Sequence, residues 1–433
     1  MKDPGAQHFL RYGYSAAMTL GWPLFLLYYL LRTKTGGKYR TNWRRRMGFG
    51  LPQRTGPEGV VWFHALSVGE TLSAIPLVKA LKDLRPELKI VFSTATETGQ
   101  VMARRNLGKD VDAFFFLPHD FPWIPGRLVK RLAPLLFIPV ETDLWPNLLR
   151  GTRRRGVPAV LVNGRLSSRS FGRLFRFRSF VQGVYSCLDH IFAQSAEDGF
   201  RFEALGVSKE CVHTAGNLKF DSALSRVGEE ELAAMRESAG IRAGRAVWIG
   251  GSTHEGEEGI LLGVHQELRN AHPDLLLILA PRHIERAAQV AVLAERIGLP
   301  AAMRSRGESA EGNAVYILDT LGELGRFYGL ADAAFIGGSL VRFGGHNPLE
   351  AVAQGKPVLW GPHLSNFREM ESSLLQGGCG RVVSSRQELK SALHEWLSDP
   401  GLREETARTA LDFIGSHSGC SRRIAEFLAR LLG

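Results

Sequence analysis

Residues 60–81, VVWFHALSVGETLSAIPLVKAL, contain the pattern that decides the fold. The apolar run from Val60 to His64 predicts a buried strand, and the residues from Thr71 to Leu84 predict a helix. Ser67-Val-Gly-Glu70 forms the turn between them. A strand that is apolar throughout and leads through a short turn into a helix is typical of a parallel sheet covered on both faces. The stretch therefore predicts an α/β fold.

Similar units continue along the chain, on both sides of a charged connector at residues 221–245. In open α/β sheets, ligands bind at the carboxyl ends of the strands. We expect two Rossmann-like lobes, with a membrane anchor and the start of a basic linker at residues 1–34, one domain at 35–232 and another at 233–433. The further predicted strands are 89–93, 135–140, 159–162, 190–193, 246–250, 275–279, 315–318, 333–336 and 357–360, with a helix near 98–105.

The composition points to acidic partners. The chain has 433 residues and a formal charge of +11, which favours phosphorylated ligands, an anionic membrane or nucleic acid. No zinc-finger spacing, RNP-like motif or long basic tail supports nucleic acid, so no nucleic-acid partner is expected. The four cysteines lack paired spacing, which argues against a disulfide framework or a zinc site.

The N-terminus predicts membrane anchoring. No charged residue occurs from Tyr12 to Leu31, about the length that a helix needs to cross the hydrocarbon core. The basic residues that follow would place the rest of the chain on the cytoplasmic side and near anionic lipid. A cleaved signal peptide fits poorly because the basic residues follow the apolar stretch. Pro23 and the surrounding aromatic residues leave a helix that enters one leaflet as an alternative to a full span.

Three residues of the first half, Glu70, Glu141 and Lys219, are candidates for catalysis, and Asp143 is a fourth if it shares the role of Glu141. Glu70 opens a helix after a strand, where an ionised carboxylate can accept a proton from a hydroxyl, but it can also be a simple helix cap. Glu141 ends a strand and therefore faces the ligand edge, and Asp143 either shares that role or caps the next helix. Lys219 lies in a polar turn, where it either neutralises phosphate charge or is a solvated lysine.

The second half carries glycine-rich turns typical of a nucleotide-phosphate site. Gly337-Gly-Ser339 follows a strand, and Gly344-Gly-His-Asn-Pro-Leu-Glu350 opens a helix, where backbone N–H groups can approach an anion. Arg282 offers a guanidinium for phosphate, and Glu350 can bind ribose hydroxyls. Neither Walker A nor dinucleotide-binding spacing is present, which argues against an ATPase and a dehydrogenase. His346 and His363 lack metal-ligand spacing, so no metal is expected.

Six blocks together resemble the 3-deoxy-D-manno-octulosonic acid (Kdo) transferases. They occur in the order of that family and extend from the anchor to about residue 370, without departures at the motif positions. A single block would be weak evidence, whereas six in order are specific. The blocks are His64-Ala-Leu-Ser-Val-Gly-Glu70, Glu141-Thr-Asp-Leu-Trp-Pro-Asn147, Gly216-Asn-Leu-Lys-Phe-Asp221, Ala280-Pro-Arg-His283, Asp319-Thr-Leu-Gly-Glu323, and Gly337-Gly-Ser-Leu340 with Gly344–Glu350.

The resemblance implies a GT-B fold and an inverting, metal-independent transferase without a cofactor. It implies that Glu70 is the general base for the glucosamine 6-hydroxyl of a lipid A precursor, lipid IVA, and that Glu141 and Lys219 stabilise the transition state. Acceptor binding is expected in the first lobe and CMP-Kdo binding in the second. The family further implies a protein of the bacterial inner membrane that acts in lipopolysaccharide biosynthesis. The CMP-binding positions it implies are Pro281, Arg282, Leu321, Gly322, Glu323, Asn347, Pro348, Leu349 and Glu350.

Two rival hypotheses remain at this stage. A related GT-B transferase or an epimerase that uses a UDP-sugar shares the fold, but a soluble epimerase would not need an anchor. A membrane-bound binding protein that has lost activity is a hypothesis of another class, and the presence of Glu70 argues against it.

Overall fold

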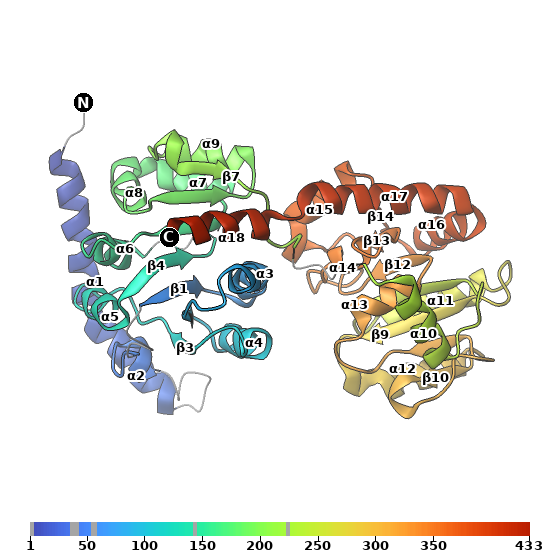
Figure 1. Cartoon of the computed structure of the whole chain (residues 1–433). Coiled ribbons are helices and arrows are strands. Elements are labelled where there is room, and N and C mark those ends of the chain that lie inside the picture. Colours follow the sequence, from blue (N-terminus) through green and yellow to red (C-terminus); the bar gives the residue numbers. More distant parts are fainter. Residues whose placement is uncertain (1–3, 35–42, 53–58, 142–144, 222–225) are drawn as a thin grey trace. The chain divides into compact units, whose positions relative to one another are not determined.

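Parallel strands form the centre of two units of the chain (Figure 1). The computed structural model describes residues 4–34, 43–52, 59–141, 145–221 and 226–433. Unit 1 comprises Met1–Ser222 and His417–Gly433, and unit 2 comprises Ala223–Ser416. Every strand pairing recorded within the described ranges is parallel, so the predicted α/β fold with parallel sheets is confirmed.

Unit 1 contains a four-stranded sheet of order β3-β2-β1-β4 and a three-stranded sheet of order β5-β6-β7. Parallel bridges from Phe137 to Ala159 and from Val140 to Val162 connect β4 with β5. The combined order begins 3-2-1-4-5-6, as in dinucleotide-binding folds. The strands are β1 (Val60–Ala65), β2 (Ile90–Thr94), β3 (Ala113–Phe116), β4 (Pro134–Pro139), β5 (Val160–Gly164), β6 (His190–Ala193) and β7 (Val212–Thr214).

Alternate residues of β1 point to opposite faces of this sheet, and each face is covered by helices. Val61 and Phe63 belong to one apolar cluster, which includes residues of α3 and α4. Val60 and Trp62 belong to another cluster, which includes residues of α5, α6, α8 and α9. The helices are α2 (Trp43–Arg46), α3 (Val68–Leu84), α4 (Glu97–Leu107), α5 (Pro125–Leu132), α6 (Pro146–Arg153), α7 (Ser168–Arg176), α8 (Arg178–Tyr185) and α9 (Ala196–Ala204).

Unit 2 contains a seven-stranded sheet of order β10-β11-β9-β8-β12-β13-β14. Its strands are β8 (Val247–Thr253), β9 (Leu276–Pro281), β10 (Ala301–Met303), β11 (Val315–Ile317), β12 (Ala333–Ile336), β13 (Val358–Trp360) and β14 (Gly380–Val382). Its helices are α10 (Glu229–Ala239), α11 (Glu257–Leu268), α12 (Ala287–Arg296), α13 (Leu324–Phe327), α14 (Leu349–Val352), α15 (Arg368–Gln376), α16 (Arg386–Ser398) and α17 (Pro400–His417).

The last helix, α18 (Cys420–Leu431), corrects the expected domain boundaries of 35–232 and 233–433. The residues after His417 return to unit 1, while residues 223–232 belong to unit 2. The cause is an apolar stripe on α18, of which Cys420, Ile424 and Leu428 are fully buried in the same cluster as α3. The Asp221 carboxylate fixes the start of this helix by accepting hydrogen bonds from the N–H groups of Gly419 and Ser421 at 2.5 and 2.6 Å.

The N-terminal helix α1 (Pro4–Lys34) packs along unit 1. Met18, Trp22 and Leu26 contact a small core formed by Met47, Phe121 and Ile124. Within the described part of the chain, no helix combines the length and the apolar character that crossing a membrane requires. The prediction of a full span is therefore not supported, since Gly13, Ser15, Thr19 and Gly21 dilute the apolar stretch.

Candidate active site

Glu70 lies in the first turn of α3, where its carboxylate closes the helix N-terminus. The Leu66 N–H donates to Oε2 at 2.5 Å, and the Ser67 hydroxyl donates to Oε1 at 3.0 Å. Ser67 Oγ accepts from the N–H of Glu70 at 3.3 Å, in the manner of a capping box. Glu70 therefore caps helix α3, which was one of the two roles expected for it. Glu70 is 8% exposed. Since each carboxylate oxygen has a second lone pair, the cap does not prevent proton acceptance.

Glu141 follows β4 and adopts a backbone conformation that is rare for a residue with a side chain. Its φ is 62°, in the left-handed region. Its N–H donates to the Val162 carbonyl at 2.9 Å, which fixes it beside β5. The Glu141 Oε1 lies 3.4 Å from the Lys219 Nζ, and these side chains are 19% and 31% exposed. The structure thus brings together two of the predicted catalytic residues. Asp143 lies outside the described residues.

Amide side chains that the sequence analysis missed hold Lys219 in place. Asn163 is fully buried with a φ of 56°, and its Oδ1 accepts from the Leu218 N–H at 3.0 Å. Asn217 donates to the Gln194 side chain at 3.0 Å and accepts from the Lys219 N–H at 3.0 Å. A signal for Asn163 was present, because a polar residue that ends an apolar run faces the ligand edge of a parallel sheet.

The predicted residues of unit 1 lie at one edge of the sheet. Glu70 follows β1 and Glu141 follows β4, and these two strands pair in parallel. Buried His64 lies near the end of β1, with its Nδ1 2.9 Å from the Ser93 Oγ. Burial lowers the pKa of His64 to about 4, so its ring is neutral at physiological pH. This edge therefore combines two carboxylates, one ammonium group and a neutral imidazole.

In unit 2, the segments 281–282 and 347–350 come close together. The Arg282 N–H donates to the Thr253 carbonyl at 2.9 Å, which places Arg282 at the ends of β9 and β8. The pKa of Glu350 lies above its usual value, because burial raises it more than the hydrogen bond from Asn347 and the charge of Arg282 lower it. A guanidinium and a carboxylate therefore lie near each other at the carboxyl edge of this sheet, where nucleotide ligands of α/β enzymes bind.

The third predicted CMP-binding segment, Leu321–Glu323, follows the neighbouring strand β11. Leu321 is 66% exposed, and Gly322 has a φ of 88°. Glu323 pairs with Arg304, which the sequence analysis did not single out, at 3.2 Å. Burial raises the pKa of Glu323, but the hydrogen bonds from Thr320 and Arg304 together lower it by more, so this pKa lies below its usual value. This ion pair fixes the segment at the same sheet edge as β9.

Stacked aromatic rings lie beside this edge. The Nε2 atoms of His254 and His346 are 2.8 Å apart, and the two rings are nearly parallel, at 8°. The Phe343 ring stacks on His254 at 4.0 Å. Burial, and secondarily the neighbouring His254, lowers the pKa of His346 to about 4. These rings act as hydrogen-bonding and packing groups, and within the described ranges no cluster of three or more His, Cys, Asp or Glu is arranged to hold a metal ion.

The turn Gly337-Gly-Ser339 does not play the predicted part of a phosphate-binding turn. Fully buried Glu257, in the first turn of α11, occupies its N–H groups. The Glu257 Oε2 accepts from Gly338 at 2.7 Å and from His254 at 3.0 Å. Its Oε1 accepts from Ser339 at 3.0 Å and from Leu340 at 2.9 Å. The anion that this turn binds is therefore a side chain of the protein itself.

Two α/β units with polar residues at the carboxyl edges of their parallel sheets place the chain among α/β proteins that bind ligands at those edges. A solved structure of this kind, the UDP-GlcNAc 2-epimerase from Neisseria meningitidis bound to UDP-GlcNAc, matches with a TM-score of 0.56. It is 13% identical, and the match covers 86% of this chain and 99% of that one. At this identity the likeness shows the fold alone.

Sequence comparison then gives the family. A family model described as 3-deoxy-D-manno-octulosonic-acid transferase (kdotransferase) matches residues 41–222. The 3-deoxy-D-manno-octulosonic acid transferase of Haemophilus influenzae is 36% identical over 425 residues, which cover 96% of this chain and 98% of that protein. The enzyme of the same name from Bordetella pertussis is 36% identical, with 86% and 87% covered. The chain belongs to the 3-deoxy-D-manno-octulosonic acid transferase family and is therefore a glycosyltransferase.

Proposed function

We propose that the chain transfers Kdo from CMP-Kdo to the glucosamine 6-hydroxyl of the lipid A precursor, with inversion at the anomeric carbon. Membership in the family supports Kdo transfer in lipopolysaccharide biosynthesis. The observation that carries the assignment is the ion pair of Lys219 with Glu141, whose backbone is strained, at the same sheet edge as Glu70. A scaffold that no longer catalysed a reaction would not need to maintain this strain.

In the proposed reaction, Glu70 accepts the proton of the acceptor hydroxyl while the hydroxyl oxygen attacks the anomeric carbon of Kdo. The new C–O bond forms as the bond from that carbon to the phosphate oxygen breaks, and CMP departs with the electron pair. Positive charge that develops on the sugar is stabilised by the Glu141 carboxylate, and negative charge on the departing phosphate by the Lys219 ammonium group. The Glu141 Oε1 and the Lys219 Nζ are 3.4 Å apart, so the two groups lie close enough to act on the same reacting centre.

The residues of unit 2 bind the CMP part of the donor in this proposal. Arg282 pairs with the phosphate, and Glu350 accepts hydrogen bonds from the ribose hydroxyls. The segments 321–323 and 347–349 form the remaining wall of the nucleotide site. The GT-B arrangement, with the acceptor on unit 1 and the donor on unit 2, belongs to the same proposal.

The proposed location is the cytoplasmic face of the bacterial inner membrane, with α1 lying in the interface. Leu20, Leu24 and Leu27 of α1 are 78%, 70% and 52% exposed, and their spacing places them along one stripe of the helix. The opposite stripe is used for packing on unit 1. An apolar stripe of this kind suits a helix whose exposed face enters the head-group region while its other face remains on the protein.

The test is incubation of the purified chain with CMP-Kdo and the tetra-acylated lipid A precursor, followed by mass spectrometry. We expect a product heavier by one or more Kdo residues, and an E70Q variant that does not form it. The proposal would be contradicted if no product formed at saturating concentrations of the acceptor and of the donor. Competition by CMP but not by UDP distinguishes it from a UDP-sugar enzyme, the alternative that the fold of the epimerase keeps open.

A further inference from the structure

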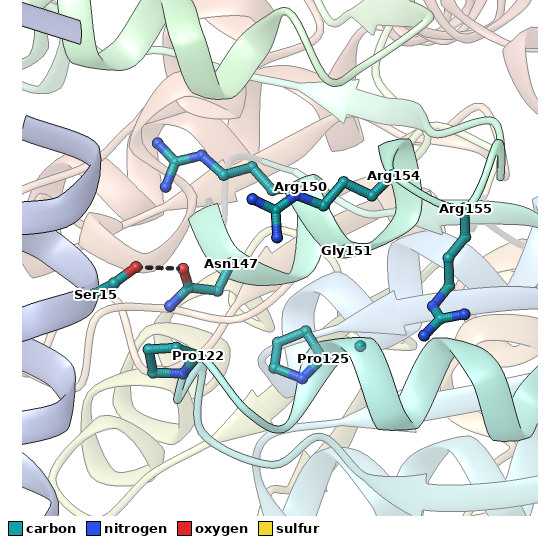
Figure 2. A pocket seen from close by; sticks show the side chains of 9 residues that line it. Ser15, Pro122, Pro125, Asn147, Arg150, Gly151, Arg154 and Arg155 are labelled. Atoms are coloured by element: carbon teal, nitrogen blue, oxygen red, sulfur yellow. Dashed lines mark hydrogen bonds between the residues drawn. The ribbon is translucent and has the colours of Figure 1, made fainter. Parts of the chain in front are cut away.

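A basic cavity of about 550 Å³ lies in unit 1 and has no part in the proposed reaction. Its walls come from α1, the start of α5 and the length of α6 (Figure 2). Ser15 of α1 donates a hydrogen bond to the Asn147 Oδ1 of α6 at 2.9 Å at one side of it. Neither Glu70 nor Glu141 is among the residues that line it. The cavity is therefore a separate candidate site.

Three arginines, Arg150, Arg154 and Arg155, line this cavity, and no acidic side chain does. Arg150 of α6 and Arg154, the C-cap residue of this helix, are four residues apart and lie on the same side of it (Figure 2). Like charges at this spacing repel each other and destabilise a helix. The adjacent Arg153, outside the cavity, instead pairs with Asp189 at 2.9 Å. The cavity thus holds three arginines with no acidic side chain in its lining.

Arg154 and Arg155 are the arginines that can accept a ligand. Within the described ranges, no carboxylate lies at ion-pair distance from either, and both are exposed. Arg150 is engaged already, since its guanidinium lies 5.8 Å from the Phe180 ring centre and its charge acts on Asp120. Guanidinium groups bind phosphate oxygens in pairs, and their planar fork suits phosphate better than a halide or a single carbonyl. The chemistry of the cavity therefore points to a phosphate group.

The setting of the cavity indicates which phosphate it takes. Ser15, in its wall, lies on the same helix as the exposed stripe of Leu20, Leu24 and Leu27. At the helical rise, these leucines are about 8 to 18 Å further along α1. We propose that this cavity binds the phosphate of an anionic phospholipid of the bilayer on which the exposed stripe of α1 rests. The site goes beyond the proposed Kdo transfer, and it rests only on the proposed placement of α1 at the membrane.

The test is co-sedimentation of the full chain with vesicles of phosphatidylcholine alone or mixed with phosphatidylglycerol. Binding needs no CMP-Kdo, so failure of the lipid site and failure of Kdo transfer are distinguishable. We expect R154Q/R155Q to lower partitioning onto the mixed vesicles about 25-fold, since each basic residue near an anionic surface contributes about fivefold. The matched control is R105Q/K109Q, which removes the same charge from exposed residues at the end of α4, and it should change partitioning less than twofold. Equal losses in both variants would show diffuse attraction and overturn the site.

Two further arms identify the source of the phosphate. Calorimetric titration with a soluble short-chain phosphatidylglycerol should show binding that R154Q/R155Q loses, and inorganic phosphate should bind more weakly. Tighter binding of inorganic phosphate than of the short-chain lipid would overturn the lipid assignment. It would also be overturned if R154Q/R155Q bound vesicles normally but had a raised KM for the lipid acceptor, since the cavity would then bind the acceptor. Variant R154K/R155K keeps the positive charge but lacks the paired N–H donors of the guanidinium, and it should lose binding only in part. An unchanged melting temperature would confirm that each variant folds.

Discussion

Replacing Glu257 by Gln should loosen the end of β12. It should also weaken CMP binding, because the Gly338 carbonyl accepts a hydrogen bond from the Gly345 N–H, just before the proposed CMP-binding residues 347–350. The carboxylate accepts four backbone hydrogen bonds, two at each oxygen, at 2.7 to 3.0 Å. Gln keeps one acceptor oxygen but presents an NH2 group to the other two N–H donors. Hydrogen bonds to a charged group contribute about 1.5–3 kcal/mol each, so the loss of two costs about 3–6 kcal/mol. The affected N–H groups belong to His254 and to residues 338–340.

Hydrogen exchange measured by mass spectrometry tests this expectation locally. A loss of 3 kcal/mol corresponds to about 150-fold faster exchange, since about 1.4 kcal/mol is a factor of ten. We expect this acceleration in peptides that contain residues 338–340, together with a lower affinity for CMP in calorimetry. The control is E255Q, at an exposed position two residues earlier, which should leave both unchanged. Exchange within threefold of the parent in E257Q would refute the reasoning.

Four further outcomes are expected. E70Q should keep the helix cap, which Gln also forms, and should lower kcat by about 10²–10⁴-fold in a steady-state assay. E70A should lower kcat too and should also lower the melting temperature measured by circular dichroism. K219M should lower kcat by about tenfold or more, with little change in the melting temperature. Burial raises the pKa of Asp120 to about 7, so the folded state holds this proton more tightly than the unfolded state. The free energy of unfolding should therefore decrease as the pH rises from about 4 to 7. In urea titrations, D120N should remove this dependence on pH. Serine at Leu20, Leu24 and Leu27 should move the chain from the membrane to the soluble fraction of cells.

Local patterns were sufficient to predict much of the fold. The strand at 333–336 is found as predicted, and the helix predicted for 71–84 begins at Val68. Strands β3 and β14 were missed, and β14 has only three residues, which carry little periodicity. The return of α18 to unit 1 was also missed. Its apolar stripe shows that it must pack, but only the tertiary structure shows against which sheet.

The candidate site shows the same division between local and long-range information. Glu70 and Glu141 follow strands, and their position relative to the ligand edge was visible in the sequence. Glu257 was not recognised, because a carboxylate in the first turn of a helix looks like an ordinary cap. Three of its four partners are more than 80 residues away. Asn163 was missed although it ends an apolar run, and its partner Leu218 lies 55 residues further on.

Backbone strain separates the candidate site from the rest of the sheets. Within the described ranges, four non-glycine residues have positive φ, and Ala133 simply ends helix α5. The other three, Glu141, Asn163 and Ser252, lie at or just beyond the carboxyl ends of β4, β5 and β8. Each costs about 1–3 kcal/mol. Of these residue types only Asn tolerates that conformation well, so a carboxylate at 141 is maintained against a local preference. The need for its side chain at the ligand edge explains that cost, because glycine would remove both the strain and the partner of Lys219.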